Sequence, residues 1–280
     1  MMVSLRRLAV LALALLIGAA GCSGSGKVRS SSPQEAFQKG TESYKSEDYD
    51  RAIKYFRQVF SYGRENEWAD DAQLYLARSY REDGRYLRAA SQYQRFAQLY
   101  SSDERVPQAQ YERAMAYYRL SPDYELDPTH TQKALDLFLL FADRHPQHEK
   151  TSEVETYIDE LRNKLARKQL AAGRQYERRE LWEAAAHAYT AVFDQYPETK
   201  WVDDALLGAV RANVSYAERS IQKKKAERYR RAIENYQRLT QIFPDSPLLD
   251  DAKSFYQTAE ERLDALDDED TEETLAGADG

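Results

Sequence analysis

The stretch "LWEAAAHAYTAVFDQYP", Leu181 to Pro197, carries a spacing of small and aromatic residues that the chain uses five times. Ala185 follows Trp182 by three residues and precedes Tyr189 by four, and the proline comes twelve residues after that alanine. Four other alanines share this register: Ala52, Ala89, Ala134 and Ala232. An aromatic residue follows each of them at four positions: Phe56, Tyr93, Phe138 and Tyr236. Self-similarity at a nearly fixed period predicts stacked copies of one structural unit.

The residue types at these positions suit pairs of closely packed helices. A small residue lies upstream of every aligned alanine and lets two helix backbones approach: Gly40, Ala77, Ala114, Gly173 and Gly208. The aromatic residue fills the layer between neighbouring pairs. Proline ends the second helix because it lacks the amide hydrogen that the preceding turn needs. The pattern resembles the tetratricopeptide repeat; the alternative, a bundle of unrelated amphipathic helices, would not require a shared register.

We therefore predict an all-α fold, a tetratricopeptide-repeat superhelix of five helix pairs plus a C-terminal capping helix. Glycine and proline total 19 of the 280 residues, and no long alternating run of β-branched residues is present. The aligned alanines are 37, 45, 51 and 47 residues apart, more than the usual 34 of this repeat. We assign the extra length to an inserted loop over 121–131, to a long helix over 151–176 and to an extension around "SIQKKKAERY".

The repeats divide the body of the chain into two parts. Repeats 1–3 occupy 33–150, and repeats 4–5 with the capping helix occupy 151–266. The final helix opens at "DDA" and has no partner, so we expect a cap of about 15–18 residues that shields the end of the stack. Residues 267–280 are acidic and poor in apolar side chains, and we expect them to be disordered.

Residues 1–21 resemble a secretory signal, with two arginines before an apolar stretch that is shorter than the ~20 residues of a membrane-spanning helix. They lead to Cys22, the single cysteine of the chain, in a pattern that resembles a bacterial lipobox. We predict that Cys22 carries diacylglycerol and acyl chains such as palmitate, and that 22–32 form a flexible tether. Ser23 resembles the residue that directs lipoproteins to the outer membrane. The alternative is an ordinary signal peptide cut near Ala20, which leaves a free thiol.

Charge and motifs argue against an enzyme and against nucleic acid as a partner. The formal net charge is −7, whereas phosphate binding needs a basic surface. The chain has no P-loop, GxSxG or HExxH motif. His145 and His148 lie in a turn without cysteines or acidic residues at ligand spacing, so we expect solvated loop residues and no metal. We expect no catalytic residue and no cofactor other than the lipid on Cys22.

A curved repeat stack binds other chains along the inner face formed by the first helix of each pair. The register places eight residues of repeats 1–3 in a candidate peptide-binding groove: Phe37, Tyr44, Leu74, Arg78, Arg81, Tyr111, Met115 and Tyr118. Aromatic side chains beside arginines suit an extended peptide with apolar side chains and a carboxylate. The two arginines are favoured because an unpaired arginine is seldom buried for structural reasons. For the aromatic residues the alternative is packing between helices. For Lys223 to Lys225 the sequence leaves two expectations: a contact with a partner or a lipid headgroup, or a solvated turn between two helices.

Three further stretches resemble the BamD family, the lipoprotein of the outer-membrane β-barrel assembly machinery. They are "DPTHTQKAL" from Asp127, "LRNKLARKQLAAGRQYERRELWEAA" from Leu161 and "YPETKWVDDAL" from Tyr196. The first resembles the Asp-Pro loop of the family's third repeat, and the second resembles the family's long helix. The third resembles the family's Tyr-Pro-Asp/Glu-Thr turn, which Asp-Ala-Leu follows. The resemblance covers 33–251.

This resemblance implies a non-enzymatic lipoprotein on the periplasmic face of the outer membrane, which takes part in the assembly and insertion of β-barrel proteins. It implies that repeats 1–3 bind unfolded clients and that repeats 4–5 bind a BamA-like barrel protein. Other assembly lipoproteins are implied as further partners. A lipid-anchored adaptor for peptidoglycan enzymes is the alternative function for the same scaffold.

Overall fold

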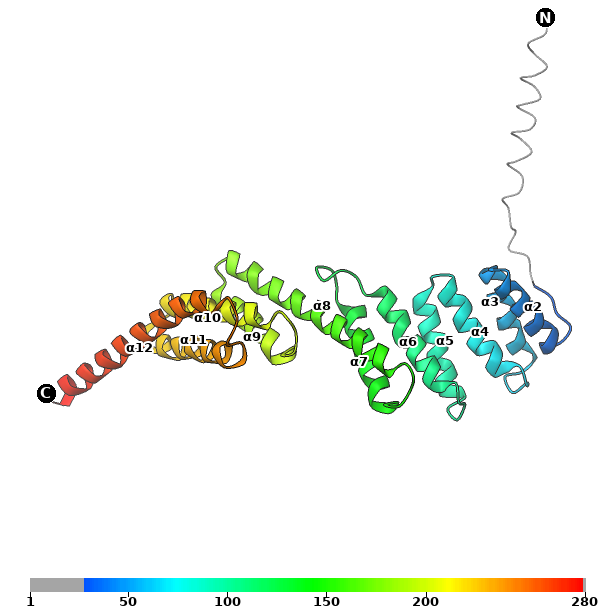
Figure 1. Cartoon of the computed structure of the whole chain (residues 1–280). Helices are drawn as coiled ribbons and strands as arrows, with labels where there is room; N and C mark the ends of the chain where they lie inside the picture. Colours follow the sequence, from blue (N-terminus) through cyan, green and yellow to red (C-terminus); the bar gives the residue numbers. More distant parts are fainter. Residues whose placement is uncertain (1–27, 279–280) are drawn as a thin grey trace, which may run out of the picture. The chain divides into compact units, whose positions relative to one another are not determined.

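The computed structural model describes the backbone of residues 28–278 and the side chains of residues 28–268. The predicted signal over 1–21 and the predicted lipid site at Cys22 lie outside the described residues. Helices pair in chain order (Figure 1): α2 (Pro33–Lys45) with α3 (Tyr49–Val59), α4 (Ala69–Glu82) with α5 (Tyr86–Leu99), α6 (Val106–Leu120) with α7 (Thr129–Arg144), α8 (Thr151–Arg178) with α9 (Trp182–Gln195), and α10 (Val202–Glu218) with α11 (Gln222–Ile242). A short 3-10 helix, η1 (Phe60–Tyr62), follows α3, and α12 (Leu249–Ala278) comes last. The prediction of an all-α repeat fold with five helix pairs and a final helix is confirmed.

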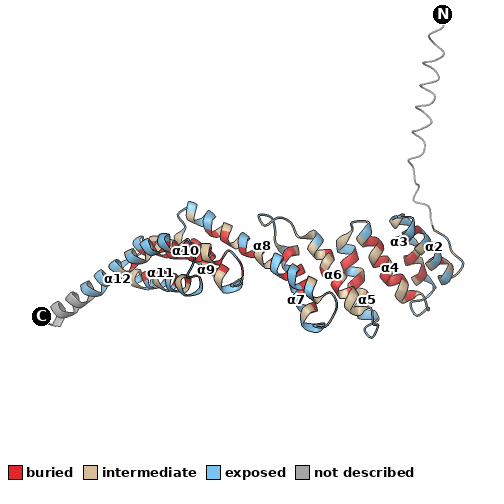
Figure 2. Cartoon of the chain, in the orientation of Figure 1, coloured by how far each residue is buried: buried red, intermediate tan, exposed pale blue. Residues whose placement is uncertain are grey.

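The close approach of paired helices depends on the glycines of the repeat. A Cβ atom on Gly173 of α8 would lie 2.6 Å from the ring of Tyr189, and one on Gly208 of α10 would lie 2.8 Å from the same ring. Gly40 of α2 is related in the same way to Phe56, at 2.6 Å. Both rings are fully buried, and Figure 2 shows buried residues along the packed faces of the helices. The predicted packing of small residues against the aromatic residue of the repeat is therefore confirmed.

Proline fixes the ends of the second helices in repeats 3, 4 and 5. Helices α7, α9 and α11 end at Arg144, Gln195 and Ile242, and one capping residue separates each end from the proline. The residue before a proline is sterically excluded from the helical region, so each helix ends there.

The described residues form two compact units, one that runs to Ser101 and one that starts at Ser102. The first contains α2 to α5 and the second contains α6 to α12. The sequence placed the division later, after residue 150. Repeat 3 belongs with repeat 4 because α8 packs against α7, where Phe138 stacks on Tyr157 with 5.3 Å between ring centroids.

The inserted loop between α6 and α7 is held by lysines of α8. Lys168 Nζ donates hydrogen bonds to the backbone carbonyls of residues 124, 125 and 126, at 3.3, 3.3 and 2.7 Å. Lys164 Nζ donates to Ser121 Oγ at 2.9 Å, and the guanidinium of Arg167 lies 4.0 Å from the ring centre of Tyr124. The loop is thus a structured part of the second unit, and α7 begins at Thr129, inside the segment that the sequence assigned to the loop.

The prediction for the C-terminal segment was wrong. Helix α12 has 30 residues and continues to Ala278, so 267–278 are helical and not disordered. Two features of the segment favour the helix: it contains glutamate, alanine and leucine, which are strong helix formers, and it has no proline. Leu266 still packs against a core cluster that contains Val210 and Tyr229, so the packed part of α12 reaches as far as the expected cap.

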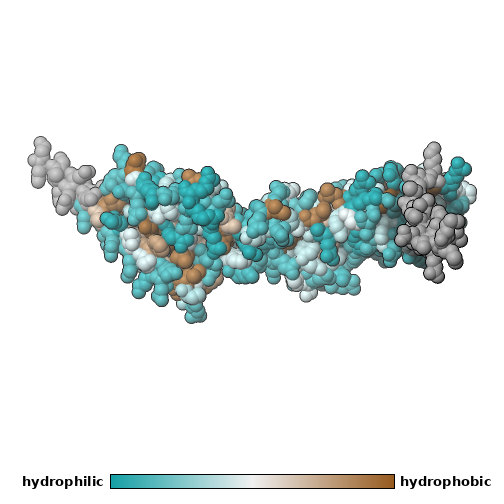
Figure 3. Space-filling view, turned by 90° about the horizontal axis from the view of Figure 1, so that it is seen from above, coloured by the Kyte–Doolittle hydropathy of each residue, from teal (hydrophilic) through white to brown (hydrophobic). Residues whose placement is uncertain are grey.

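Over the described residues, none of the helices is both long enough and apolar enough to cross a bilayer. Hydrophilic side chains predominate on the face shown in Figure 3, and hydrophobic patches interrupt them in several places.

Candidate functional site

The eight predicted groove residues are divided between the two units, and each unit is described by itself. Phe37, Tyr44, Leu74, Arg78 and Arg81 belong to the first unit, and Met115, Tyr111 and Tyr118 belong to the second.

The first unit gathers half-buried aromatic residues around Tyr75 of α4. The ring centroid of Tyr75 lies 5.6 Å from that of Phe37 and 5.6 Å from that of Tyr44, both on α2. The guanidinium of Arg78 lies 5.3 Å from the centre of the Tyr75 ring. We call Phe37, Tyr44, Tyr75 and Arg78 the aromatic face. Phe56 is fully buried behind it and stacks on Tyr75 at 5.4 Å.

Helical geometry explains this cluster. Phe37 and Tyr44 are seven residues apart, about two turns, and so project from the same side of α2. Tyr75 and Arg78 are three residues apart on α4, which places them on neighbouring positions of one helix face. Burial raises the pKa of the Tyr44 hydroxyl, and the carboxylate of Glu82 adds to the rise. The aromatic face is therefore uncharged except for Arg78.

The two arginines that the sequence favoured differ in their surroundings. Arg78 makes no ion pair within the described residues and contacts the ring of Tyr75. Arg81 Nε donates a hydrogen bond to Glu82 Oε1 at 3.0 Å. The argument that an arginine without a partner must serve binding therefore applies to Arg78 and not to Arg81.

Two predicted groove residues lie in the core. Leu74 is only 4% exposed and Tyr111 only 6% exposed. The hydroxyl of Tyr111 donates a hydrogen bond to Glu153 Oε1 at 3.1 Å, and burial together with this carboxylate raises its pKa. The assignment of these two side chains to an open groove is corrected, because the structure buries them in packing between helices, the alternative that the sequence left open for aromatic residues.

Tyr118 and Met115 remain half-buried in the second unit. Tyr118 stacks near Tyr157 of α8, with ring centroids 4.7 Å apart, and its hydroxyl donates to Glu160 Oε2 at 2.5 Å. Burial, followed by the hydrogen bond to that carboxylate, raises the pKa of Tyr118 to about 12. The tyrosine hydroxyls on this side of the second unit are thus engaged by acidic residues of α8.

Sequence reasoning missed Tyr75, the centre of the aromatic face. It lies two residues before the small residue Ala77, where repeat 1 has Gln38 and repeat 3 has Glu112. No aromatic residue recurs at this position, so the alignment carried no signal for it. The remaining clue was its three-residue spacing to Arg78.

The second unit has a hollow of about 440 Å³ between α9, α10 and α11. Its lining includes the imidazole of His187 and charged side chains of both signs: Glu183, Asp194, Arg231, Glu234 and Arg238. A second hollow, of about 610 Å³, shares Glu183, His187 and Tyr216 with the first and adds the apolar side chains Leu181 and Trp182. We call the two together the C-terminal groove. The C-terminal groove thus combines apolar side chains with charges of both signs.

A half-buried charge network links α8, α9 and α10 of the second unit. Arg211 Nη2 donates to Glu177 Oε2 at 2.9 Å, and the Tyr189 hydroxyl donates to the same oxygen at 2.6 Å. Burial alone would raise the pKa of Glu177, but the hydrogen bonds from Arg211 and Tyr189 outweigh it and hold the pKa below its ordinary value. The network fixes the orientation of α8 and α10 around the Tyr189 ring.

The basic run from Lys223 to Lys225 occupies the first turn of α11, where Lys224 lies 3.9 Å from Glu227. Its role in contacting a partner or lipid remains a prediction.

His145 and His148, which we expected to be solvated loop residues, are half-buried and form hydrogen bonds within the protein. His145 Nε2 lies 2.8 Å from Gln110 Oε1, and His148 Nδ1 accepts a hydrogen bond from the backbone N–H of Lys150 at 3.1 Å. Both rings pack 5.2 Å from the ring of Phe141, centroid to centroid. Within the residues that the structure describes, no group of three histidine, cysteine or acidic side chains could hold a metal ion.

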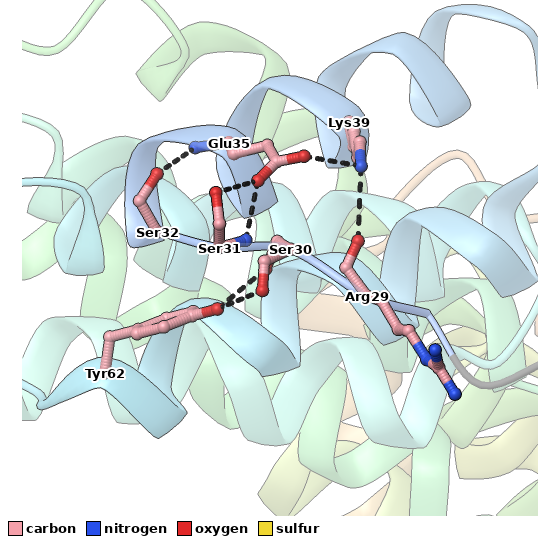
Figure 4. Close-up of polar contacts among 7 residues, drawn as sticks. All are labelled: Arg29, Ser30, Ser31, Ser32, Glu35, Lys39 and Tyr62. Carbon is pink, nitrogen blue, oxygen red and sulfur yellow. Dashed lines mark hydrogen bonds and ion pairs between the residues drawn. The ribbon is translucent and has the colours of Figure 1, made fainter.

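The N-terminal segment that precedes α2 is attached to the first unit (Figure 4). The Tyr62 hydroxyl donates to the backbone carbonyl of Ser30 at 2.5 Å, and Lys39 Nζ donates to the carbonyl of Arg29 at 3.2 Å. Glu35 accepts a hydrogen bond from the N–H of Ser31 at 2.6 Å and pairs with Lys39 at 2.7 Å. Lys39 first and Ser31 second lower the pKa of Glu35 to about 2. These contacts fix the point from which the chain leads back to Cys22.

Comparisons with known proteins found a matching family model and several similar proteins. The model of the YfiO family, described as outer membrane lipoprotein, matches residues 29–228. The outer membrane protein assembly factor BamD of Caulobacter vibrioides is 28% identical over 213 residues, which cover 74% of this chain and 70% of that protein. The protein of the same name from Neisseria meningitidis serogroup B is 22% identical over 228 residues, 78% and 82% of the two chains. A solved TPR repeats protein from Bacteroides fragilis aligns with a TM-score of 0.43 and 12% identity, over 83% of this chain and 100% of that one.

Proposed function

Since this chain belongs to the YfiO family of outer membrane lipoproteins, we propose that it is a lipid-anchored scaffold for the assembly of outer-membrane β-barrel proteins. The observation that carries the proposal is the family match over 29–228, which spans the aromatic face, the inserted loop and the long helix α8. Relatives matched over most of their length are named as outer membrane protein assembly factors. The family and the repeat fold are those of a non-enzymatic scaffold, and the chain is not an enzyme.

In this proposal the aromatic face receives unfolded clients. Phe37, Tyr44 and Tyr75 offer ring surface to apolar side chains, and Arg78 offers a guanidinium to a carboxylate. A client that ends in an aromatic residue presents both groups together. Tyr118 and Met115 of the second unit are a separate half-buried surface that offers contact to apolar side chains.

The same proposal assigns the C-terminal groove to a BamA-like barrel protein. Leu181 and Trp182 offer apolar contact, whereas Glu183, Arg231 and Arg238 offer charges that fix the register of a partner. Other assembly lipoproteins are proposed as further members of the complex, on the periplasmic face of the outer membrane.

Purification of the native protein from detergent-solubilised membranes tests the assignment. We expect a large outer-membrane barrel protein to co-purify in stoichiometric amount. A preparation without a barrel protein, or one dominated by peptidoglycan hydrolases, would contradict the proposal and favour the adaptor function. The anchor is tested separately, since Cys22→Ser should release the protein from membranes washed with ~1 M salt into the soluble fraction.

Client binding is tested with Arg78→Gln and peptides that end in an aromatic residue. We expect the variant to lose about 10- to 150-fold in affinity, because a charge-assisted hydrogen bond contributes about 1.5–3 kcal/mol. Arg179→Gln is the matched control, since Arg179 is an exposed arginine of the second unit and is not one of the residues that form the aromatic face. Equal affinities for the two variants would remove Arg78 from the site.

A further inference from the structure

Four arginines of the first unit line one hollow on the side of α3 and α5. Arg57 comes from α3, Arg64 from the loop after η1, and Arg88 and Arg95 from α5. The hollow has a volume of about 690 Å³, and Leu76 and Tyr80 of α4 lie at its floor. We call it the arginine groove. Its described lining contains no acidic side chain.

The charges of these arginines are not neutralised by the protein. None of the four makes an ion pair within the described residues, and Arg88 instead lies 5.8 Å from the centre of the Tyr80 ring. Another arginine of the same unit behaves differently, because Arg85 pairs with Asp50 at 2.6 Å. Four guanidinium groups around one hollow attract an anion, and their planar donors match the oxygens of phosphate or carboxylate groups.

The attachment of the N-terminal segment brings this groove close to the predicted anchor. Ser30 is bound to Tyr62, which is only two residues from Arg64, a distance of at most about 7 Å along the backbone. From Cys22 to Ser30 the chain can extend over about 30 Å at most. A lipid on Cys22 therefore keeps Ser30 within that distance of the membrane surface, and the arginine groove begins two residues beyond Tyr62, to which Ser30 is bound.

We propose that the arginine groove binds the phosphate groups of anionic phospholipids in the membrane that holds the lipid anchor. This inference rests on the proposed anchor at Cys22. An anionic bilayer is the phosphate source nearest to the attachment point, which favours it over an acidic polypeptide. Leu87 lies at the groove next to Arg88 and is 51% exposed, so it can enter the boundary between headgroups and acyl chains. The tether and the groove would together hold the first unit against the membrane.

Vesicle binding tests the groove without the anchor. The chain from Ser23 to Gly280 lacks Cys22 but keeps every residue of both units, and its co-sedimentation is measured with vesicles of phosphatidylglycerol and phosphatidylcholine and with vesicles of phosphatidylcholine alone. We expect binding to the anionic vesicles only. The double variant Arg57→Gln with Arg64→Gln should bind about 30-fold more weakly, because each basic residue near an anionic surface contributes about fivefold. Binding should disappear at ~1 M salt, where the Debye length is about 3 Å.

The matched control removes two positive charges elsewhere. Lys133 and Lys253 are exposed residues of α7 and α12, and Lys133→Gln with Lys253→Gln should leave vesicle binding within about twofold, since neither lysine lines the groove. Equal losses in the two double variants would refute the groove and indicate unspecific attraction.

A second probe distinguishes lipid from protein. The synthetic peptide LDDEDTEETLA carries a dense acidic sequence, and the lipid proposal predicts that it competes poorly with vesicles. Arginine-dependent binding of the peptide without vesicle binding would overturn the proposal. Circular dichroism confirms that each variant keeps its helical content. Fractionation of Cys22→Ser in ~1 M salt, where binding through the groove disappears, separates the two proposals, because a protein that stays membrane-bound under this condition contradicts the anchor, whereas the vesicle assay alone decides the groove.

Discussion

Replacing Gly173 by alanine should destabilise the second unit, although alanine is the better helix former. A methyl group at this position would lie 2.6 Å from the Tyr189 ring, well inside the 3.5–4.0 Å of an ordinary carbon contact. The ring cannot move away easily, because Gly208 touches it as well and its hydroxyl is bound to Glu177 at 2.6 Å. Forcing a methyl group into such a packed core costs about 1–3 kcal/mol, whereas the change from glycine to alanine in a helix gains about 1 kcal/mol. We expect a net loss of up to about 2 kcal/mol in the free energy of unfolding.

A second substitution reverses the sign of this effect. In a Tyr189→Leu background the ring is gone, and the smaller side chain leaves room for the methyl group. Gly173→Ala should then stabilise the protein by up to about 1 kcal/mol, the gain in helix propensity alone. The four variants of this cycle are compared by urea unfolding of the chain from Ser23 to Gly280, followed by circular dichroism at 222 nm. If alanine stabilises the parent protein, or costs the same in both backgrounds, the contact with Tyr189 does not explain the glycine.

Three other predictions concern the charge network, the inserted loop and the N-terminal segment. The pKa of Glu177 is lowered in the folded state, so its ionised carboxylate stabilises the fold fully above the ordinary pKa of 4.5, and this stabilisation is lost as the pH falls through the lowered pKa. The urea midpoint of the parent protein should therefore fall between pH 7 and about pH 3.5, and Glu177→Gln should make this fall smaller. Lys168→Met should raise amide hydrogen exchange in 121–128 with unchanged helical content, since three backbone carbonyls lose their donor. Tyr62→Phe should speed tryptic cleavage after Arg29, because the bond to the Ser30 carbonyl is lost, and an unchanged cleavage rate would show that this bond does not hold the segment.

The repeat register could be predicted because it depends on contacts between neighbouring helices. Gly173 and Tyr189 are sixteen residues apart, and their relation recurs in Gly40 and Phe56 at the same separation. Because this contact always joins residues at the same separation, the same residue types recur at that separation in the sequence. The same holds for the prolines that end the second helices.

Features that depend on contacts between different repeats produce no recurring spacing in the sequence and could not be predicted. Tyr111 can be buried because the carboxylate of Glu153, 42 residues later, accepts a hydrogen bond from its hydroxyl. Tyr75 lies at the centre of the aromatic face because two aromatic residues of α2 pack on it. The division after Ser101 follows from the packing of α8 on α7, which no single repeat encodes. The arginine groove was invisible for the same reason, since its cations come from two helices and a loop at different positions of the repeat.

The two units treat equivalent inner positions in opposite ways, and this difference bears on where a client binds. Phe37 and Tyr44 of the first unit have their counterparts in Tyr111 and Tyr118 of the second, at the same distances from the small residue of their repeats. In the second unit α8 supplies carboxylates to both tyrosine hydroxyls, and one of the rings is buried. In the first unit both rings stay half-buried and lie beside a guanidinium that has no carboxylate within the described residues. Under the proposed function, a client carboxylate would meet an available cation at the first unit and acidic side chains at the second, and we therefore propose the aromatic face as the point of first contact.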